Sequence, residues 1–342
     1  MFQFETIVTA VLALLISVII TQFVIPWVMK VSLTRGITTV DVHKKNCPTI
    51  PEPGGLAPLL GFIFTILIII FFFEYLNVNS QGFEPLLAGV LSVVIAGLIG
   101  FLDDVFKIRW RDKILLGFLP AIPLMALKVG TSTINVWIIG EIDLTISLPY
   151  IGNLSLYSLI FIPLAVNFAF NSFNMLAGFN GLEAGNGVIS LAIILLLTLI
   201  VDNTVVSLFA ASLLGCYLVL LKYNWYPAKI LIGDTGTLTL GTGIVVALII
   251  ANMDRLAIGL FGLHFINFLL FFLYLKTGQT AKIASIDEDG NIIAPCPYTV
   301  YWFLPYFLKN IGERKNVLIL LVIHTGIAII VFLFSLPYYL SS

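Results

Sequence analysis

Long apolar runs recur along the whole chain, and they decide what it can fold into. A helix needs about 20 apolar residues to cross the hydrocarbon core of a bilayer. Ten segments meet or approach this length, so we predict an all-α polytopic membrane protein of about ten transmembrane helices, a single domain over residues 1–342. Nine or eleven spans are the alternatives. The predicted spans are 6–29, 55–76, 85–102, 114–130, 154–172, 183–201, 204–221, 230–252, 255–275 and 316–340.

Few residues carry a charge. Of the 342 residues, 60% are hydrophobic and 10% are charged, whereas soluble domains carry about 25% charged residues. A soluble globule of this length could not cover its surface with so few charges. The composition therefore excludes a soluble enzyme, a nucleic-acid-binding protein and a disordered chain, and it makes the bilayer the expected partner. The formal net charge of −1 favours neither anionic nor cationic partners.

The basic residues lie almost entirely in alternate loops. With ten spans, fifteen of the 17 lysines and arginines fall in or beside the loops that follow odd-numbered spans, and only Lys128 and Arg255 fall on the other side. Loops rich in Lys and Arg face the cytoplasm, so we place both termini outside. The fifteen bases are Lys30, Arg35, Lys44, Lys45, Lys107, Arg109, Arg111, Lys113, Lys222, Lys229, Lys276, Lys282, Lys309, Arg314 and Lys315.

Two loops are long enough to form structure of their own. On the outer side, residues 131–153 alternate apolar and polar types between glycines, which predicts a short external hairpin. Asn153 begins an Asn-Leu-Ser glycosylation sequon in this loop. Residues 276–315 form the predicted cytoplasmic loop before the last span.

Two adjacent carboxylates, Asp103 and Asp104, close the third span at its cytoplasmic end. Neighbours on a helix point about 100° apart, so the pair can serve two tasks, such as metal handling and proton transfer. The alternative is an interfacial cap in which acids and nearby bases neutralise each other. Because acids at the bilayer boundary are unfavourable without partners, we favour the functional interpretation.

Asparagines and a glycine-rich loop follow at the cytoplasmic end of the fifth span. Asn167, Asn171 and Asn174 recur at i, i+4 and i+7, which places them on one helical face. Hydrogen bonding between membrane helices is the alternative role of such a face. Residues 175–185 read MLAGFNGLEAG, and glycines let backbone amides approach a ligand closely. Oxygen ligands beside such a loop suit a phosphorylated substrate.

Asp234 is a lone carboxylate inside the eighth apolar run. Ionisable residues within a membrane span are functional candidates, and a helix cap is the alternative. With Asp103, Asp104, Asn171 and Asn174 it forms a set of oxygen ligands at cytoplasmic ends. Carboxylates and amides select Mg²⁺ or Mn²⁺ and not zinc.

Histidines and cysteines form no metal-binding pattern. They are scattered along the chain, so we interpret the histidines as structural residues and the cysteines as free thiols. These residues are His43, His264, His324, Cys47, Cys216 and Cys296.

The motifs together resemble those of the polyprenyl-phosphate N-acetylhexosamine-1-phosphate transferase superfamily of membrane enzymes, and in particular its dolichyl-phosphate branch in eukaryotes and archaea. The resemblance covers the chain in span order, and the NMLAGFNGLEAG stretch is its most specific part. The stretches that carry it are residues 50–52 with 54–55, residues 101–113, residues 174–185, residues 224–227 and residues 233–235.

This resemblance implies a function. Such an enzyme uses Mg²⁺ to transfer N-acetylglucosamine-1-phosphate from UDP-N-acetylglucosamine to a dolichyl or other polyprenyl phosphate and releases UMP. The reaction is the first lipid-linked step of N-glycan-type assembly. The resemblance implies about ten transmembrane helices with a cytoplasmic catalytic face, in the cell membrane of an archaeon or the endoplasmic reticulum of a eukaryote. It is compatible with a homodimer.

The resemblance also implies roles for single residues. Asn174 and Asp234 match the Mg²⁺ ligands, Asp103 and Asp104 match a catalytic pair tied to the lipid phosphate and metal, and Lys113 matches a lysine that binds phosphate. Gly178 and Asn180 match residues around the uracil ring, and Glu52 a residue near the nucleoside. Leu231 stands where the eukaryotic enzyme has an aromatic residue against the base. The expected substrate-binding residues are Glu52, Asn171, Gly178, Asn180 and Leu231.

One departure from the family lies in the last cytoplasmic loop. Relatives carry a basic Arg/His cluster there, whereas Cys296-Pro297 is followed here by Tyr298-Thr299-Val300-Tyr301-Trp302. Without this cluster, the diphosphate would be bound by Mg²⁺ and by basic residues from elsewhere in the chain. Lys276 and Lys282 are candidates for these basic residues. The sugar of the donor stays open.

Two alternatives compete with this function. Within the class, the enzyme would transfer another UDP-linked N-acetylhexosamine-1-phosphate to undecaprenyl phosphate. From another class, the chain would be a membrane carrier or flippase. Transporters place polar sites near the bilayer midplane, whereas the polar motifs here gather at cytoplasmic ends, which favours the enzyme.

Overall fold

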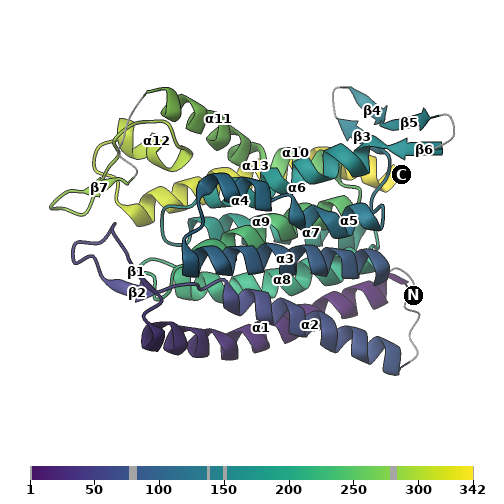
Figure 1. Ribbon diagram of the computed structural model, residues 1–342, viewed down its shortest axis with the longest axis horizontal. Coiled ribbons are helices and arrows are strands. Elements are labelled where there is room, and N and C mark those ends of the chain that lie inside the picture. The colour runs from purple at the N-terminus through teal and green to yellow at the C-terminus, as the bar shows by residue number, and fades with distance from the viewer. Residues whose placement is uncertain (1, 77–82, 137–138, 149–151, 278–282, 342) are drawn as a thin grey trace.

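The computed structural model describes residues 2–76, 83–136, 139–148, 152–277 and 283–341. Most of these residues lie in helices that run side by side (Figure 1). The helices are α1 (Phe2–Arg35), α2 (Leu56–Tyr75), α3 (Phe83–Phe106), α4 (Trp110–Leu116), η1 (Leu119–Ala121), α5 (Ile122–Ala126), η2 (Tyr157–Phe161), α6 (Ile162–Met175), α7 (Leu182–Ile200), α8 (Thr204–Asn224), α9 (Gly233–Ile250), α10 (Asp254–Leu260), α11 (Gly262–Lys276), α12 (Val300–Phe307) and α13 (Glu313–Ser341).

The strands form four two-stranded antiparallel ladders in the described part of the chain. β1 pairs with β2, β3 with β4, β5 with β6, and β7 with β8. The strands are β1 (Thr38–Val40), β2 (Thr49–Pro51), β3 (Thr133–Val136), β4 (Gly140–Asp143), β5 (Thr145–Leu148), β6 (Gly152–Ser155), β7 (Ser285–Ile286) and β8 (Ile292–Ile293).

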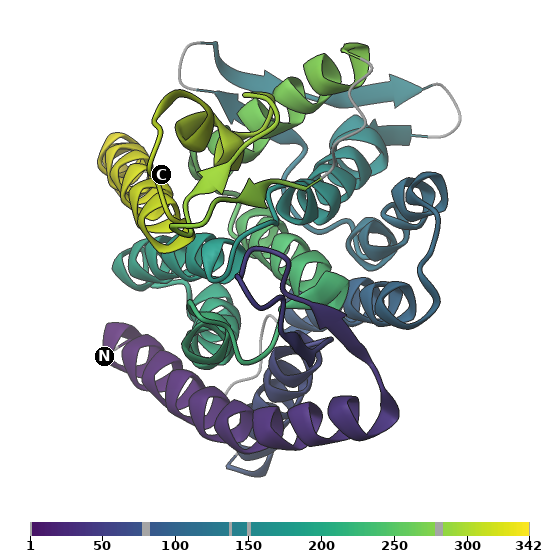
Figure 2. The same ribbon diagram turned by 90° about the vertical axis from the view of Figure 1, so that its left-hand side faces the viewer.

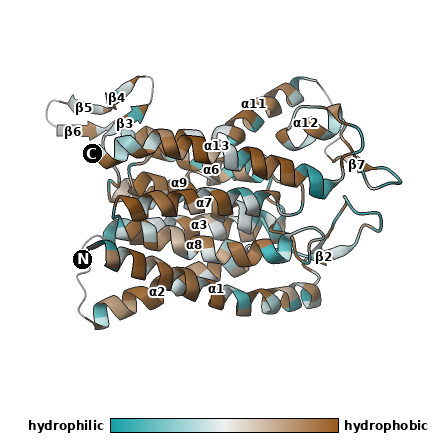
Figure 3. Ribbon diagram, turned by 180° about the vertical axis from the view of Figure 1, so that it is seen from behind, coloured by the Kyte–Doolittle hydropathy of each residue, from teal (hydrophilic) through white to brown (hydrophobic). Residues whose placement is uncertain are grey.

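The membrane-spanning prediction is confirmed for the fold class. Within the described residues, eight helical segments are long and apolar enough to cross a bilayer, and α10 with α11 make a ninth if this pair, bent by 51°, is one span. Each coincides with a predicted apolar run. Figure 3 shows hydrophobic residues along the helices and hydrophilic residues gathered toward the loops around β2 and β7. The chain is therefore an all-α polytopic membrane protein.

The prediction of one continuous span over 114–130 is wrong. Three short helices, α4, η1 and α5, occupy this part of the chain, and none is long enough to cross a bilayer alone. Pro120 and Pro123 lie at the starts of η1 and α5. Proline has no backbone N–H, so neither residue could continue an α-helix from the preceding turn. The broken segment packs against α3 and α6.

Both termini lie at the end of the bundle that carries β3–β6, and the C-terminus lies beside these strands (Figure 1). The β1–β2 and β7–α12 regions lie at the opposite end. This arrangement agrees with an even number of crossings. The predicted hairpin over 131–153 is present as two short ladders, β3–β4 and β5–β6, with residues 137–138 and 149–151 of that prediction outside the described part.

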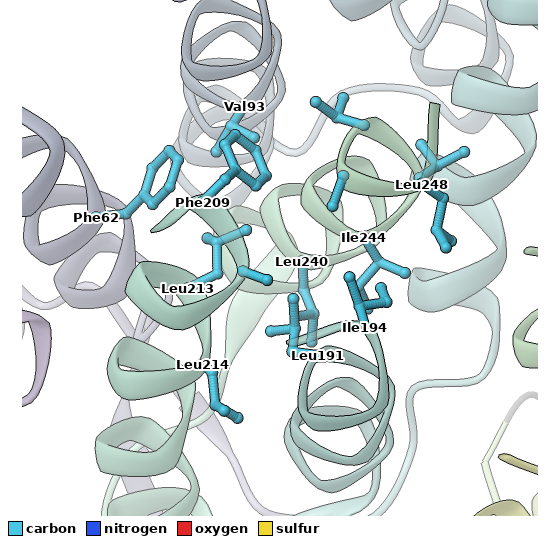
Figure 4. Packing of buried hydrophobic residues seen from close by; sticks show 14 of the residues in the cluster. Phe62, Val93, Leu191, Ile194, Phe209, Leu213, Leu214, Leu240, Ile244 and Leu248 are labelled. Carbon is cyan, nitrogen blue, oxygen red and sulfur yellow. The ribbon is translucent and has the colours of Figure 1, made fainter. Parts of the chain in front are cut away.

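The core is built around α8 and α9, which are buried along most of their length. α1 packs along α8, and α3 packs along α9. Figure 4 shows Phe209 of α8 beside Val93 of α3, and Leu240 and Ile244 of α9 beside Leu191 and Ile194 of α7. The two central helices thus form a fixed frame for the side chains at their ends.

A glycine brings α3 and α9 together where the polar residues begin. A Cβ atom on Gly100 would lie 2.6 Å from the backbone oxygen of Asp234, so only glycine allows this approach. Asp103 and Asp104 follow one turn later on α3. The close crossing therefore delivers both aspartates to the start of α9.

Candidate active site

Asp104 holds the first turn of α9. Its carboxylate is buried and accepts the backbone N–H of Asp234 at 2.7 Å, the N–H of Thr235 at 2.9 Å and the Thr235 hydroxyl at 2.5 Å. The first N–H groups of a helix have no partner within the helix, and a carboxylate satisfies them well. A side chain at Gly233 would contact this carboxylate, since a Cβ there would lie 2.7 Å from Oδ2. Both oxygens of Asp104 are thus engaged.

Asp103, Lys113 and Asp234 form a separate ionic cluster. The Lys113 ammonium of α4 makes an ion pair with Asp103 and another with Asp234 Oδ1 at 3.1 Å. The second oxygen of Asp103 accepts the N–H of Ile108 at 2.7 Å. Burial alone would lower the pKa of Lys113, but the charges of Asp234 and Asp103 outweigh it and raise that pKa above its usual value. The lysine is held charged between two acids.

A cavity of about 260 Å³ opens beside this cluster. It lies at the end of the bundle away from both termini, where the β1–β2 loop reaches toward the last loop of the chain (Figure 2). The cavity brings together the expected site residues Glu52, Asn174, Gly178, Asn180, Leu231 and Asp234. Its further lining residues are 40–43, Ala177, Phe179, Glu183, Asn224, Ile232, Gly233 and Thr237.

The glycine-rich loop between α6 and α7 forms one wall of this cavity. The N–H of Gly178 donates to the buried Glu183 carboxylate at 2.7 Å, and the N–H of Gly181 donates to Asn224 Oδ1 at 3.0 Å. Gly181 has φ +84°, a conformation that glycine adopts without strain. Buried acceptors on α7 and α8 therefore fix the path of the loop.

A buried ionic network ties the glycine-rich loop to the first and last loops. Lys44 makes an ion pair with Glu313 and another with Asp41 at 3.3 Å. Glu313 accepts the N–H of Asn180 at 2.7 Å, and Asp41 accepts its amide Nδ2 at 2.9 Å. The Lys44 ammonium also lies 4.4 Å from the centre of the Tyr226 ring.

The sequence alone did not reveal this network. Lys44 entered the sequence argument only as one base among fifteen, and Asp41 and Glu313 were not singled out. Glu313 is a charged residue at the start of the last apolar run. This position was the available signal that Glu313 has a partner.

Asn171 lies apart from the other expected substrate-binding residues and does not line the cavity. Its amide donates to Asn167 Oδ1 at 2.9 Å, and Asn167 donates to the backbone oxygen of Ile114 at 2.7 Å. Asn167 thus connects α6 to α4, and Asn171 holds Asn167 from within α6. The shared helical face thus carries two functions, since Asn174, three residues further on, does line the cavity.

The last loop places an aromatic residue where relatives are expected to have bases. Tyr301 of α12 packs on the glycine-rich loop. A Cβ atom on Gly178 would lie 3.0 Å from the Tyr301 ring, and the ring centres of Phe179 and Tyr301 are 5.6 Å apart. Lys276 ends α11 and does not line the cavity. Lys282 lies outside the described residues.

The histidines divide into two groups. His264 and His324 are buried within the bundle, as expected of structural residues. His43 instead lines the cavity. Position 43 stands in a loop between apolar runs, and no sequence pattern distinguished it.

The donor atoms suit a hard divalent cation. Asp234 and Asn174 both line the cavity and offer carboxylate and amide oxygens, whereas Asp104 does not line it and holds the first turn of α9 with both of its oxygens. The described residues include no cluster of three or more His, Cys, Asp or Glu arranged to hold a metal. Mg²⁺ needs few protein ligands when substrate phosphates and water complete its shell, so this pair fits Mg²⁺ bound together with a phosphorylated substrate.

The bundle of membrane helices holds an acid–lysine cluster and a polar cavity at one end, an arrangement that suits a membrane-embedded transferase. Comparison with known proteins agrees. The family model described as glycosyl transferase family 4 matches residues 86–252. A protein of Methanocaldococcus jannaschii that is provisionally named a glycosyltransferase is 30% identical over 266 residues, which are 74% of this chain and 72% of that protein. The chain belongs to glycosyl transferase family 4.

Two further relatives carry more specific names. A Saccharolobus solfataricus protein, provisionally named UDP-N-acetylglucosamine–dolichyl-phosphate N-acetylglucosaminephosphotransferase, is 27% identical over 328 residues, which cover 93% of each chain. A Dictyostelium discoideum protein with the same name, without that qualification, is 28% identical over 310 residues, 82% of this chain and 72% of its own. The resemblance seen in the motifs is confirmed over most of the chain.

Proposed function

We propose that the protein transfers N-acetylglucosamine-1-phosphate from UDP-N-acetylglucosamine to a dolichyl or other polyprenyl phosphate and releases UMP. An oxygen of the lipid phosphate attacks the β-phosphorus, the bond from that phosphorus to the bridging oxygen breaks, and UMP leaves with the electron pair. Relatives across most of the chain carry this activity in their names. The observation that carries the proposal is the Asp103–Lys113–Asp234 cluster beside the cavity.

Asp234 and Asn174 are the residues that would hold Mg²⁺, with Mn²⁺ as a substitute. The ion, when bound, neutralises the diphosphate and stabilises the charge that develops on UMP. The cavity supports this need for a cation, because Asp41, Glu52, Glu183 and Asp234 line it and its described lining includes no Lys or Arg.

Lys113 and Asp103 serve the lipid phosphate in this proposal. The second pKa of a phosphate monoester is about 6, so the nucleophile is already ionised near neutral pH and needs orientation more than deprotonation. The Lys113 ammonium lies 3.1 Å from Asp234 Oδ1. It can give up this ion pair and bind an oxygen of the lipid phosphate instead. Asp103 fixes the position of that ammonium.

The proposed site faces the cytoplasm. The cavity and the ion pairs lie at the bundle end opposite both termini, and this is the end at which the basic loops gather. UDP-sugars are soluble and reach such a face directly, while the polyprenyl phosphate stays in the bilayer beside it. The cell membrane of an archaeon or the endoplasmic reticulum of a eukaryote is the matching location.

Donor competition tests the substrate. Purified protein in polyprenyl-phosphate vesicles with Mg²⁺ would receive equal amounts of UDP-linked N-acetylglucosamine, N-acetylgalactosamine and N-acetylmuramoyl-pentapeptide, and the lipid product would be identified by mass. We expect N-acetylglucosaminyl-diphospho-lipid to dominate. A dominant product from either other donor would overturn the donor assignment, and sugar uptake into the vesicles without any lipid product would favour a carrier.

A further inference from the structure

A patch of basic and apolar side chains lies where the chain passes from α3 into α4. We call it the α3–α4 surface, and its members are Phe106, Lys107, Arg109, Trp110, Arg111 and Leu115. Phe106, Trp110 and Leu115 are 72%, 66% and 68% exposed, and none of the seven described residues of α4 is buried. Large apolar side chains are unfavourable in water, so this surface needs a partner outside the chain.

The ion pairs of Lys113 place this surface at the boundary of the membrane helices. Lys113 lies in α4 and contacts Asp103 near the end of α3 and Asp234 at the start of α9. The chain then turns back along the bundle, since η1 and α5 pack against α3. α4 therefore lies at the depth where membrane spans end, which is the depth of the lipid headgroups. Trp and Tyr residues are enriched there, because their rings are apolar and carry a polar atom.

The protein itself does little to neutralise the bases of the α3–α4 surface. Arg109 and Arg111 are both exposed, and within the part of the chain that the structure describes neither has an ion-pair partner. Lys107 has one partner, Glu52, at 3.5 Å, and its side chain remains 69% exposed. Asp112 is the one acid in this segment of the sequence. The surface therefore presents a net positive charge at the headgroup level.

Charge and exposed rings together indicate the partner. The guanidinium carbon of Arg111 lies 5.4 Å from the centre of the Trp110 ring, so a cation and an apolar ring are presented side by side. An anionic phospholipid matches both, because its phosphate pairs with guanidinium groups and its acyl chains cover the rings. We propose that the α3–α4 surface binds anionic phospholipids of the surrounding bilayer. The inference goes beyond the proposed reaction, since these lipids are not substrates and Lys113, assigned to the acceptor phosphate, is held by the ionic cluster instead.

Quenching of Trp110 fluorescence by brominated lipids tests this inference. The protein would be reconstituted into phosphatidylcholine vesicles with increasing fractions of brominated phosphatidylglycerol or of brominated phosphatidylcholine, and the signal of Trp110 would be the difference between the wild type and Trp110→Phe. We expect phosphatidylglycerol to quench Trp110 at lower fractions than phosphatidylcholine does. Arg109→Gln and Arg111→Gln should each weaken the affinity for phosphatidylglycerol about fivefold, the usual contribution of one base near a membrane surface, whereas Arg111→Lys should keep most of it.

Arg314→Gln is the matched control, because it removes an exposed base of α13 outside the α3–α4 surface and should leave the quenching of Trp110 unchanged. Thermal unfolding in detergent shows whether each variant folds. If Trp110→Phe does not, the total Trp quenching of the two Arg→Gln variants is compared with that of Arg314→Gln.

Three results would overturn the inference. They are equal quenching by the two brominated lipids, a wild-type preference in both Arg→Gln variants, and relief of quenching by polyprenyl phosphate but not by unbrominated phosphatidylglycerol. The last result would assign the surface to the acceptor lipid. A wild type that prefers phosphatidylglycerol but releases no UMP would overturn the proposed function and leave this inference in place.

Discussion

The carboxylate of Asp104 accepts both the backbone N–H and the hydroxyl of Thr235, at 2.9 and 2.5 Å, 131 residues further along the chain. Its sequence neighbour Asp103 contacts Lys113 instead. Two adjacent aspartates at one helix end therefore have different tasks. One fixes the start of α9, and the other belongs to the ionic cluster beside the cavity.

Asp104→Asn should lower stability as well as activity. An amide keeps one acceptor but turns an N–H₂ group toward the N–H donors of α9, so buried donors lose their partner at about 1–3 kcal/mol. We expect a lower midpoint of thermal unfolding in detergent and weak UMP release. Asp103→Asn is the matched variant, and it should lose activity with a smaller loss of stability. Equal unfolding midpoints for the two variants would contradict this division of tasks.

Lys113→Met should reduce kcat by about 10²–10³-fold, the usual effect of removing one preorganised donor from a developing charge. Lys113→Arg keeps the charge and should retain more activity. The paired acids raise the pKa of Lys113, so its charge and the stability it contributes persist through neutral and alkaline pH and are lost only as pH rises through this raised value. If the rate of the wild type fell as the pH rose through neutrality, and Lys113→Arg removed this fall, Lys113 would be losing its proton near neutral pH. That result would contradict a lysine that stays charged.

Breaking the Lys44 network should weaken binding of the UDP-sugar. Lys44→Met leaves Asp41 and Glu313 buried without their cation, and breaking a buried ion pair typically costs about 3–5 kcal/mol. Because Glu313 and Asp41 also hold Asn180, we expect a raised KM along with lower stability. A double-mutant cycle with Glu313→Gln measures the coupling, and strictly additive effects would show that the pair does not act as a unit.

Asn171 and Asn174 offer a matched test of the cavity. Asn174→Ala should raise the Mg²⁺ concentration needed for half-maximal activity about 10–100-fold, the range found when groups that support a metal are removed. Asn171→Ala removes a hydrogen bond to Asn167 within α6 and should leave the Mg²⁺ requirement unchanged, with at most a loss of stability. Titration of both variants with Mg²⁺ compares them. If Asn171→Ala raised the Mg²⁺ requirement and Asn174→Ala did not, the metal would be assigned to the wrong asparagine.

Much of the fold could be predicted because a bilayer leaves few ways to pair the backbone. Apolar runs located the spans, and the alternation of bases agrees with both termini lying at one end. The break at Pro120 and Pro123 was missed, since hydropathy reports an apolar run and not its helix geometry.

The site was predictable residue by residue only where a motif was specific. The asparagine spacing placed Asn171 and Asn174 on one face, yet Asn171 bonds Asn167, which is itself held by Ile114 of α4. No local pattern encodes the position of α4. Lys44 and Glu313 are 269 residues apart, so their pairing appears only after folding. The hydrogen bonds between Asp104 and Thr235 likewise join residues far apart in the sequence and form only after folding.

The most direct test of the central claim is the identity of the released nucleotide. Purified protein in vesicles with polyprenyl phosphate, Mg²⁺ and UDP-N-acetylglucosamine would be assayed for UMP, UDP and the lipid product, with Asp234→Ala as the inactive control. The account predicts one UMP for each N-acetylglucosaminyl-diphospho-lipid, and no product from the variant. Release of UDP, which requires cleavage at the sugar carbon, or full activity in Asp234→Ala would contradict it.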